Sequence, residues 1–323
     1  MPTVTISIIN FRTGDLTIAC LESVLAELAG GEGCPATDGE VIVVDNASGD
    51  GSADRIAAWI AARPDAPVRL VRSERNGGFS AGHNLAIAAS RSAHVLLLNS
   101  DALLRPGCLS ALLAEVEADP QAGLVAARLE DESGTLQTSC FRFHTALSEL
   151  IRGANSGPVT TALRRWEVPL GPDPAPGDIE WVSFACILLR RAMIDRIGPL
   201  DEGYFLYYED VEYCLRARRA GWQVRFCPRA RAMHLEGGSG PAAALQTTQT
   251  RKPAYVYESR ARFFYQKGGR RALVAANLAW LIGRGLARIR PLIGKPVPPA
   301  AECEFRDLWT NAADPLNLGV RPR

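Results

Sequence analysis

Three short polar clusters, each directly after an apolar run, contain side chains that could bind a nucleotide or a metal ion. They are Asn10-Phe11-Arg12, Asp45-Asn46-Ala47-Ser48 and Asn99-Ser100-Asp101. A carboxylate such as Asp101 can hold Mg2+ or Mn2+ through one or two oxygens and leave the rest of the coordination shell to a diphosphate. Asp45 is placed to hydrogen-bond a nucleotide base or ribose. Both aspartates lie in turn-forming sequences, so a purely structural role is the alternative for each.

A pair of acids, Glu209 and Asp210, lies where an aromatic stretch at 204–208 gives way to a predicted helix. One acid of the pair, if accessible, could take a proton from a hydroxyl group. The rings of the aromatic stretch would then form a wall against which a sugar stacks. The alternative is that Asp210 caps the helix, and capping would lower its pKa and make it a poorer base.

Two further segments carry weaker signals. His234 precedes a glycine-rich loop, from which an imidazole can reach a metal, although a lone histidine is more often structural. The stretch NGGFSAGHN at 76–84 opens a helix whose N-terminus favours phosphate. It matches neither the P-loop nor the G-x-G-x-x-G pattern, and taken alone its glycines are better explained by a left-handed turn.

The elements that must position these residues alternate between strands and helices. Apolar runs predict strands over 3–11, 40–44, 67–73 and 94–101, and helical spacing predicts helices over 15–29, 52–62, 76–90 and 109–119. This alternation predicts an α/β fold with a doubly wound, mostly parallel sheet. Because ligands bind at the carboxyl ends of such strands, the three polar clusters are expected on one functional edge.

The pattern changes after Gly123. We expect strands around a turn at 131–134, and then a surface loop at 155–177. A strand and a short helix follow over 178–198, and an aromatic loop at 201–208 leads into a helix at 211–220. After a loop at 237–250, basic helices are expected at 255–267 and 271–292.

Composition narrows the class of protein. The 323 residues include 36 basic and 35 acidic ones, a balance that argues against nucleic acid as a partner. The eight cysteines form no C-x-x-C pair, which indicates reduced thiols in a cytoplasmic protein, with neither a disulfide framework nor a zinc site. The first residues enter a strand at once, and no uninterrupted apolar run is long enough to span a bilayer.

Seven stretches together carry a resemblance to a known family. They are SIINFRTGDL, VIVVDNASGDGS, ERNGGFSAGHNLAI, LLLNSDALL, WVSFACILLRR, GPLDEGYFLYYEDVEYCLRARRAGW and HLEGGSG, in order from residue 6 to 240. The chain resembles the family-2 glycosyltransferases with the GT-A fold, especially the rhamnosyltransferase-like branch that builds cell-surface polysaccharides. The resemblance implies a GT-A domain at 1–240, with a nucleotide-sugar half at about 1–101 and an acceptor half at about 102–240. Residues 241–323 would form a helical extension.

The resemblance also implies roles for individual residues. Metal ligands would be Asp101 and His234, with Asn99 standing where the family often has a second aspartate. The donor would be bound by Phe11, Arg12, Asp45, Arg75, Gly78, Asn84 and Ser100. Asp210 would be the general base, with Glu209 as the alternate, and Ser183–Cys186 would shape the acceptor side, where Phe184 replaces a frequent glycine.

The implied reaction is metal-dependent, inverting transfer of a sugar from a nucleotide-sugar, dTDP-rhamnose or a UDP-sugar, to a hydroxyl of a saccharide or lipid-linked saccharide. The Q-x-x-R-W pattern of processive synthases is missing, so transfer of one or few sugars is expected. Rival interpretations are a sugar nucleotidyltransferase and a non-catalytic sugar-nucleotide-binding protein. A nicotinamide oxidoreductase is disfavoured by the missing G-x-G-x-x-G.

The basic helices at 255–267 and 271–292 mix large apolar residues with arginine and lysine. Such helices can lie on anionic lipid, which would place the protein in the cytoplasm or peripherally on the inner face of the membrane. The alternative is that their apolar face packs on the catalytic domain or on a second subunit as a homodimer.

Overall fold

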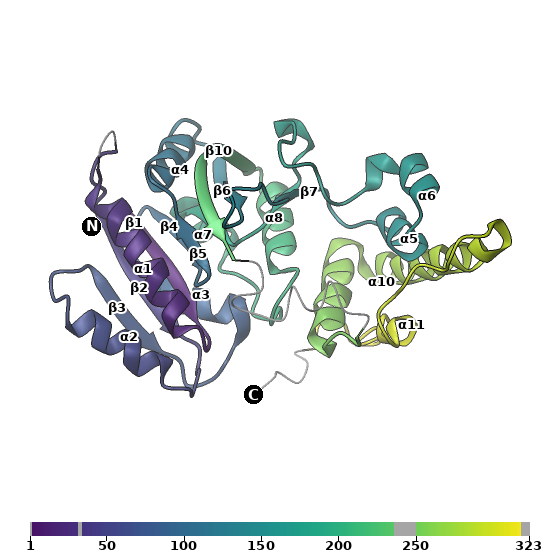
Figure 1. The fold of residues 1–323 in the computed structure, drawn as a ribbon, viewed down its shortest axis with the longest axis horizontal. Helices are drawn as coiled ribbons and strands as arrows, with labels where there is room; N and C mark the ends of the chain where they lie inside the picture. Colours follow the sequence, from purple (N-terminus) through teal and green to yellow (C-terminus); the bar gives the residue numbers. More distant parts are fainter. Residues whose placement is uncertain (1, 32–33, 236–249, 318–323) are drawn as a thin grey trace.

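The computed structural model describes residues 2–31, 34–235 and 250–317. An eight-stranded sheet in the order β3-β2-β1-β4-β9-β6-β10-β5 forms the centre, and a two-stranded sheet, β7-β8, lies beside it. Helices cover both faces of the large sheet, and a helical extension reaches away from it (Figure 1). The predicted α/β, GT-A-type architecture with a mostly parallel sheet and a C-terminal helical extension is confirmed.

The first half of the chain folds as the alternating pattern predicts. Its elements are β1 (Val4–Asn10), α1 (Gly14–Ala29), β2 (Gly39–Asp45), α2 (Ser52–Ala61), β3 (Val68–Arg72), α3 (Gly78–Ala89), β4 (His94–Asn99) and α4 (Cys108–Glu117). β1 pairs in parallel with both β2 and β4, so it lies between them. Alternate residues of each strand point to opposite faces, and the apolar ones form two cores, one on each side of the sheet.

The second half completes the sheet with strands of mixed direction. They are β5 (Ala102–Leu104), β6 (Ala122–Glu130), β9 (Cys186–Arg190) and β10 (Gln223–His234), with α7 (Arg191–Ile197) after β9. β9 is antiparallel to both β4 and β6 and joins the two halves. Sequence analysis missed β5 and β10: β5 has three residues, and β10 alternates buried positions with charged ones and carries a register shift after Cys227.

Beside the main sheet, a smaller layer consists of β7 (Cys140–Phe141), α5 (Ala146–Ala154), α6 (Gly157–Ala162) and β8 (Trp181–Val182), with 3-10 turns η1 (Arg164–Trp166) and η2 (Pro176–Asp178). The prediction of a plain loop at 155–177 was therefore wrong in part. Pro158 sits in the first turn of α6, where a proline is compatible with a helix because its missing N–H has no partner there.

The acid pair opens a helix. α8 (Glu209–Arg219) begins two residues earlier than predicted, and Tyr208, not Asp210, occupies the N-cap position. The interpretation of Asp210 as the cap is therefore wrong. Tyr207 and Tyr208 have φ of 69° and 67°, a left-handed conformation that is costly for bulky side chains. The left-handed conformation of these two tyrosines thus sets the direction in which α8 begins.

The C-terminal extension consists of α10 (Ala254–Arg288), η3 (Arg290–Ile293) and α11 (Glu304–Asp307). α10 is interrupted at Gly268 and Gly269, where φ changes from −161° to 70°. The two helices predicted at 255–267 and 271–292 are therefore confirmed as the two parts of α10, which run in different directions (Figure 1). Most of the loop predicted at 237–250 lies outside the described residues.

Buried charges and a close backbone approach attach this extension to α5. Arg260, which is 4% exposed, donates to Glu149 Oε2 at 2.9 Å, and Arg152 pairs with both Glu149 and Glu304. Burial alone would raise the pKa of Glu149, but Arg152 and Arg260 beside it lower that pKa to about 2. A Cβ on Gly153 would stand 2.3 Å from the carbonyl oxygen of Trp280, so only glycine permits the contact.

The variant Glu149→Gln is expected to lower the free energy of unfolding by about 3–5 kcal/mol, because it leaves buried arginines without their carboxylate. Urea unfolding measures the change. The wild-type contribution should fade as the pH falls from about 5 towards 2, because the folded pKa is depressed below the ordinary value.

The matched control is Asp54→Asn. Asp54 pairs with Arg72 at 2.7 Å, but these side chains are 78% and 51% exposed. Its loss should cost less than about 1 kcal/mol. Equal losses in both variants would show that the buried cluster does not stabilise the extension.

Candidate active site

A buried hydrogen-bond network fixes the carboxyl ends of β1 and β2. Asn10 and Asp45 are partners in the strand register. Asp45 Oδ1 accepts from Asn10 Nδ2 at 2.7 Å and from Ser48 Oγ at 2.6 Å. The turn role considered for Asp45 is thus visible, and its role toward a nucleotide base stays a prediction.

The same network reaches β4. Asn10 Oδ1 accepts from the backbone N–H and the hydroxyl of Thr13. Thr13 Oγ1 lies 3.0 Å from Ser100 Oγ. Ser100, directly before Asp101, is therefore tied to the Asp45 turn through buried polar groups, and the ends of three neighbouring strands hold one arrangement.

Phe11, Arg12 and Arg75 lie near the outside of this edge. Arg12 has φ of 61°, and its Nε donates to the carbonyl of Ser48 at 3.1 Å. Its guanidinium stands 5.1 Å from the Phe11 ring centroid. The Arg75 side chain is exposed. These three residues have accessible planar or charged groups, and their contacts with a donor stay predictions.

The two residues predicted as metal ligands lie side by side. His234 Nε2 is 3.6 Å from Asp101 Oδ1, although 133 positions separate the two residues in the chain. The pairing of β10 with β5 sets this contact, because His234 is the register partner of Ala102. Asn99 Nδ2 is 3.4 Å from the same imidazole nitrogen. β10, which the sequence did not reveal, thus delivers the histidine.

Gln137, which sequence analysis did not single out, fixes the histidine tautomer. Its Nε2 donates to the carbonyl oxygen of His234 at 3.0 Å. Its Oε1 therefore faces His234 Nδ1, at 3.3 Å. An acceptor at this position requires Nδ1 to carry the proton, so Nε2 presents a lone pair toward Asp101.

A divalent cation fits this donor set. One carboxylate and one imidazole nitrogen could hold it, and diphosphate oxygens and water would complete the shell. Within the described part of the chain, no group of three or more histidine, cysteine, aspartate or glutamate side chains is arranged to hold a metal. A cation here would thus depend on oxygens brought by the ligand.

Gly78 joins this edge to the aromatic loop. Its φ is 81°, and a Cβ at this position would stand 2.0 Å from the carbonyl oxygen of Phe205. The N–H of Phe79 donates to that carbonyl at 2.9 Å. On the other side, Asn46 Nδ2 donates to the carbonyl of Gly78 at 3.0 Å. The glycine therefore lets the start of α3 bridge β2 and the loop at 201–208.

Asn84 supports the same loop from within. Its amide donates to the carbonyl of Leu200 at 2.9 Å and to Glu202 at 3.1 Å. Its Oδ1 accepts from the N–H of Leu200 at 3.0 Å. The structure shows a loop-anchoring role for Asn84, and its predicted contact with a nucleotide-sugar stays a prediction.

Burial raises the pKa of both acids of the pair. Burial raises the pKa of Glu209 well above its ordinary range, with a further contribution from the negative charge of Asp210. Burial also raises the pKa of Asp210 to about 7, although the N–H of Val211 donates to its carboxylate at 2.8 Å. Asp210 is the more exposed acid of the pair, so it is the one that can meet a hydroxyl group.

Residues 183–186 connect this acid pair to the end of β4. The carbonyl of Ala185 accepts from the N–H of Asn99 at 2.9 Å. Phe184 is 3% exposed, and its ring packs edge-on against Tyr213 of α8, with centroids 6.2 Å apart. Phe184 is thus part of the core, while its neighbours run between the two groups of acids.

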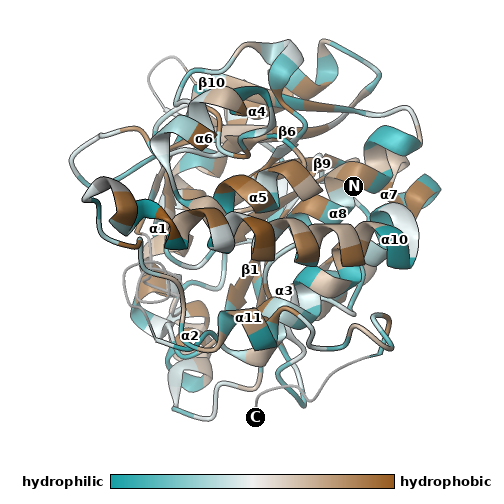
Figure 2. Ribbon diagram, turned by 90° about the vertical axis from the view of Figure 1, so that its right-hand side faces the viewer, coloured by the Kyte–Doolittle hydropathy of each residue, from teal (hydrophilic) through white to brown (hydrophobic). Residues whose placement is uncertain are grey.

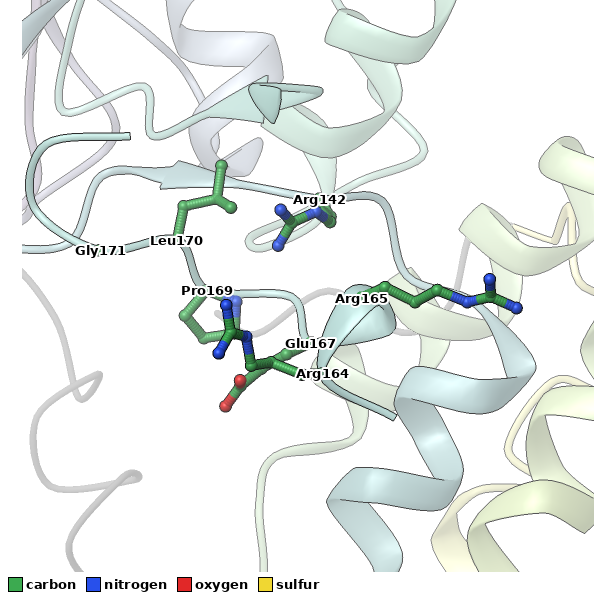
Figure 3. A pocket seen from close by; sticks show the side chains of 7 residues that line it. All are labelled: Arg142, Arg164, Arg165, Glu167, Pro169, Leu170 and Gly171. Atoms are coloured by element: carbon green, nitrogen blue, oxygen red, sulfur yellow. The ribbon is translucent and has the colours of Figure 1, made fainter. Parts of the chain in front are cut away.

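A separate cavity of about 410 Å³ lies beside β7. Its lining residues are Arg142, Arg164, Arg165, Glu167, Pro169, Leu170 and Gly171. Arg142 and Arg164 point toward the hollow, while Arg165 points away (Figure 3) and stacks on Trp166 at 3.7 Å. None of these residues was a predicted site residue, and the charge of the lining is partly balanced, because Glu167 belongs to it and Arg142 pairs with Asp178 at 3.1 Å.

The strand order and the polar edge define a GT-A fold, typical of enzymes that use nucleotide-sugars. Two family models match: Glycosyl transferase family 2 over residues 5–167, and Glycosyl transferase family group 2 over residues 94–293. The chain therefore belongs to glycosyl transferase family 2. It is a glycosyltransferase of the rhamnosyltransferase-like branch.

Two curated relatives and one solved structure illustrate this family membership and this fold. The N-acetylglucosaminyl-diphospho-decaprenol L-rhamnosyltransferase of Mycobacterium tuberculosis is 29% identical over 240 residues, covering 67% of this chain and 73% of that protein. Rhamnosyltransferase WbbL of Escherichia coli is 25% identical over 164 residues, covering 49% and 60%. The mannosyltransferase PcManGT of Pyrobaculum calidifontis, in complex with GDP-Man and Mn2+, has a TM-score of 0.58 at 16% identity, covering 91% and 76%, and shows the shared fold.

The variant Gly78→Ala is expected to lower the free energy of unfolding by about 3 kcal/mol or more and to reduce sugar transfer, because a methyl group would push Phe205 and the acid pair away. Chemical unfolding and a transfer assay measure the two effects.

Gly134→Ala is the control: its φ is 82°, but nothing lies within 4 Å of the added Cβ. It should cost only about 1–2 kcal/mol and keep activity. Equal activity in both variants would refute the bridging role.

Proposed function

We propose that the protein is an inverting, metal-dependent glycosyltransferase that uses a nucleotide-diphosphate sugar. The observation that carries the proposal is the adjacency of Asp101 and His234 at the end of β4, 3.6 Å apart. Their residue types suit Mn2+ or Mg2+, with imidazole favouring Mn2+. When bound, such a cation neutralises the negative charge on a departing nucleoside diphosphate. Incubation of the protein with nucleotide-sugars, with and without each metal, tests the proposal by release of nucleoside diphosphate.

The chain's own residues supply the rest of the chemistry. The fixed edge formed by Asn10, Asp45 and Ser100 orients the nucleotide, and Phe11, Arg12 and Arg75 contact its outer side. Asp210 accepts the proton of the acceptor hydroxyl as that oxygen attacks the anomeric carbon. The leaving group departs from the opposite face of the sugar, so the anomeric configuration inverts. Glu209 is the more deeply buried acid of the pair, and burial raises its pKa.

The proposed donor is dTDP-rhamnose, with a UDP-sugar as the alternative, and the proposed acceptor is a lipid-linked saccharide used for cell-surface polysaccharide. The names of the Mycobacterium tuberculosis and Escherichia coli relatives support rhamnose, and the first of them names a diphospho-decaprenol acceptor. A panel of nucleotide-sugars with a lipid-diphosphate acceptor tests both assignments.

The variants Asp101→Ala and Asp210→Asn should fail in different ways. Asp101→Ala should abolish metal-dependent binding of the nucleotide-sugar, measured by calorimetry. Asp210→Asn should keep that binding and lower turnover by about 10²–10⁴-fold, the range of a general base. In the wild type, kcat/KM should rise with pH, reach half of its maximum near pH 7, and level off about one to two pH units higher, because the base works only when deprotonated. Near-normal turnover of Asp210→Asn would overturn the base assignment, and Glu209→Gln is the comparison that tests the alternate base.

The variant Gln137→Leu should weaken Mn2+ binding by about 10–100-fold, because it removes the acceptor that keeps the proton on His234 Nδ1. Gln137→Glu keeps an oxygen facing Nδ1 and should restore most of the affinity. Titration with Mn2+ in the presence of nucleoside diphosphate measures this without requiring transfer. Unchanged affinity in Gln137→Leu would show that this amide does not set the tautomer.

A further inference from the structure

The outer face of the second part of α10 carries an exposed apolar stripe. It consists of Val274, Leu278, Ile282, Leu286 and Ile289, whose side chains are 42%, 48%, 58%, 40% and 56% exposed. Their spacing of three or four residues places them on one side of the helix. α10 lies at the front in Figure 2, with hydrophobic residues recurring along it. Five large apolar side chains in one row form a surface that favours contact with an apolar partner.

The opposite side of this helix is fixed to the body of the protein. Leu273, Ala276, Trp280 and Ala287 are buried. A Cβ on Gly283 would stand 2.3 Å from the carbonyl oxygen of Leu150 in α5, so the two backbones touch. The stripe therefore cannot turn inward without breaking this contact.

Basic residues accompany the stripe, and acids are missing. The sequence contains no aspartate or glutamate from Ser259 to Ala301. Arg271 and Arg288 are exposed beside the stripe, and neither makes a hydrogen bond or ion pair within the described residues. Lys295 follows the helix and is also exposed. The surface around the stripe is thus cationic.

We propose that this stripe docks the protein on the surface of an anionic phospholipid bilayer. The apolar side chains would enter the boundary between headgroups and acyl chains, while Arg271 and Arg288 would face lipid phosphates. A second copy of the chain is a poorer occupant, because two such faces would bring like charges together without any acid between them.

The helix lies on the bilayer and does not cross it. Among the described residues, Ala254–Leu292 passes for a spanning helix by length and composition, with a mean hydropathy of 1.3 in its most apolar window. The second part of this stretch is packed against α5, however, where a Cβ on Gly283 would stand 2.3 Å from the carbonyl oxygen of Leu150, so lipid cannot surround it. Arg284 also donates to the carbonyl of Pro298 at 3.1 Å, which ties the helix to the chain that follows.

Cosedimentation of the full chain with vesicles tests the proposal. At low salt, the protein should pellet with vesicles made of equal parts phosphatidylglycerol and phosphatidylcholine. About tenfold less protein should pellet with vesicles of pure phosphatidylcholine. Leu278→Glu with Ile282→Glu should lower binding to the anionic vesicles by about tenfold or more. Arg271→Glu with Arg288→Glu should lower it similarly and remove most of its salt dependence. Leu85→Glu, on α3 and 40% exposed, is the matched control and should bind as the wild type does.

Circular dichroism confirms that each variant folds, and Leu278→Ser with Ile282→Ser replaces the glutamate pair if it does not. Without vesicles, each variant should release nucleoside diphosphate from a nucleotide-sugar as fast as the wild type does. Failure of membrane docking can therefore be distinguished from failure of the proposed function. Wild-type protein that stays in solution with anionic vesicles at low salt would overturn the proposal. A dimer in light scattering that the stripe variants abolish would overturn it in favour of a second copy.

Discussion

The close approach of Gly78 to the carbonyl of Phe205 determines where the acid pair stands relative to the sheet. One side of Gly78 is held by Asn46 at the end of β2, and the other meets the aromatic loop that leads into α8. A side chain at this position would collide with the backbone of Phe205 and push the aromatic loop away from the start of α3. The positive φ of the glycine and the left-handed tyrosines that follow Phe205 are therefore two parts of one constraint.

The contact between Gly78 and Phe205 keeps two groups of carboxylates apart, and each group has a different environment. At the end of β4, Asp101 lies beside His234, whose Nδ1 faces Gln137. At the start of α8, Glu209 and Asp210 are desolvated together, which raises the pKa of both. The different tasks that we propose for these acids would thus follow from burial and neighbours rather than from residue type. Because the sheet edge is already fixed by hydrogen bonds, neither environment needs to form when the substrate arrives.

Sequence patterns predicted the elements from β1 to β4, and α4, because apolar strands alternate there with helices of regular spacing. They failed where structure depends on distant partners. β10 is stabilised by pairing with β6 and β5, and nothing local marks it as a strand. Gln137 reaches His234 across 97 positions of the chain, so no spacing rule could find it. The start of α8 was misplaced because the strained Tyr208, a poor capping residue by type, occupies the N-cap. Asp101 and His234 were each candidate metal ligands by residue type and position, but only the family resemblance paired them.

The helical extension is part of the site's framework as well as a surface. Arg262 of the first part of α10 holds Asp201 with two hydrogen bonds, at 2.9 and 3.0 Å, and Gln266 accepts from Tyr204 at 2.6 Å. Both partners lie in the loop that leads to the acid pair. The glycine break then turns the chain so that the second part packs on α5 and presents its apolar stripe outward. The first part also contacts α5, through Arg260 and Glu149, so both parts of the broken helix hold the extension on the body of the protein. The extension therefore fixes the orientation of the acid pair relative to the surface on which we propose the protein docks.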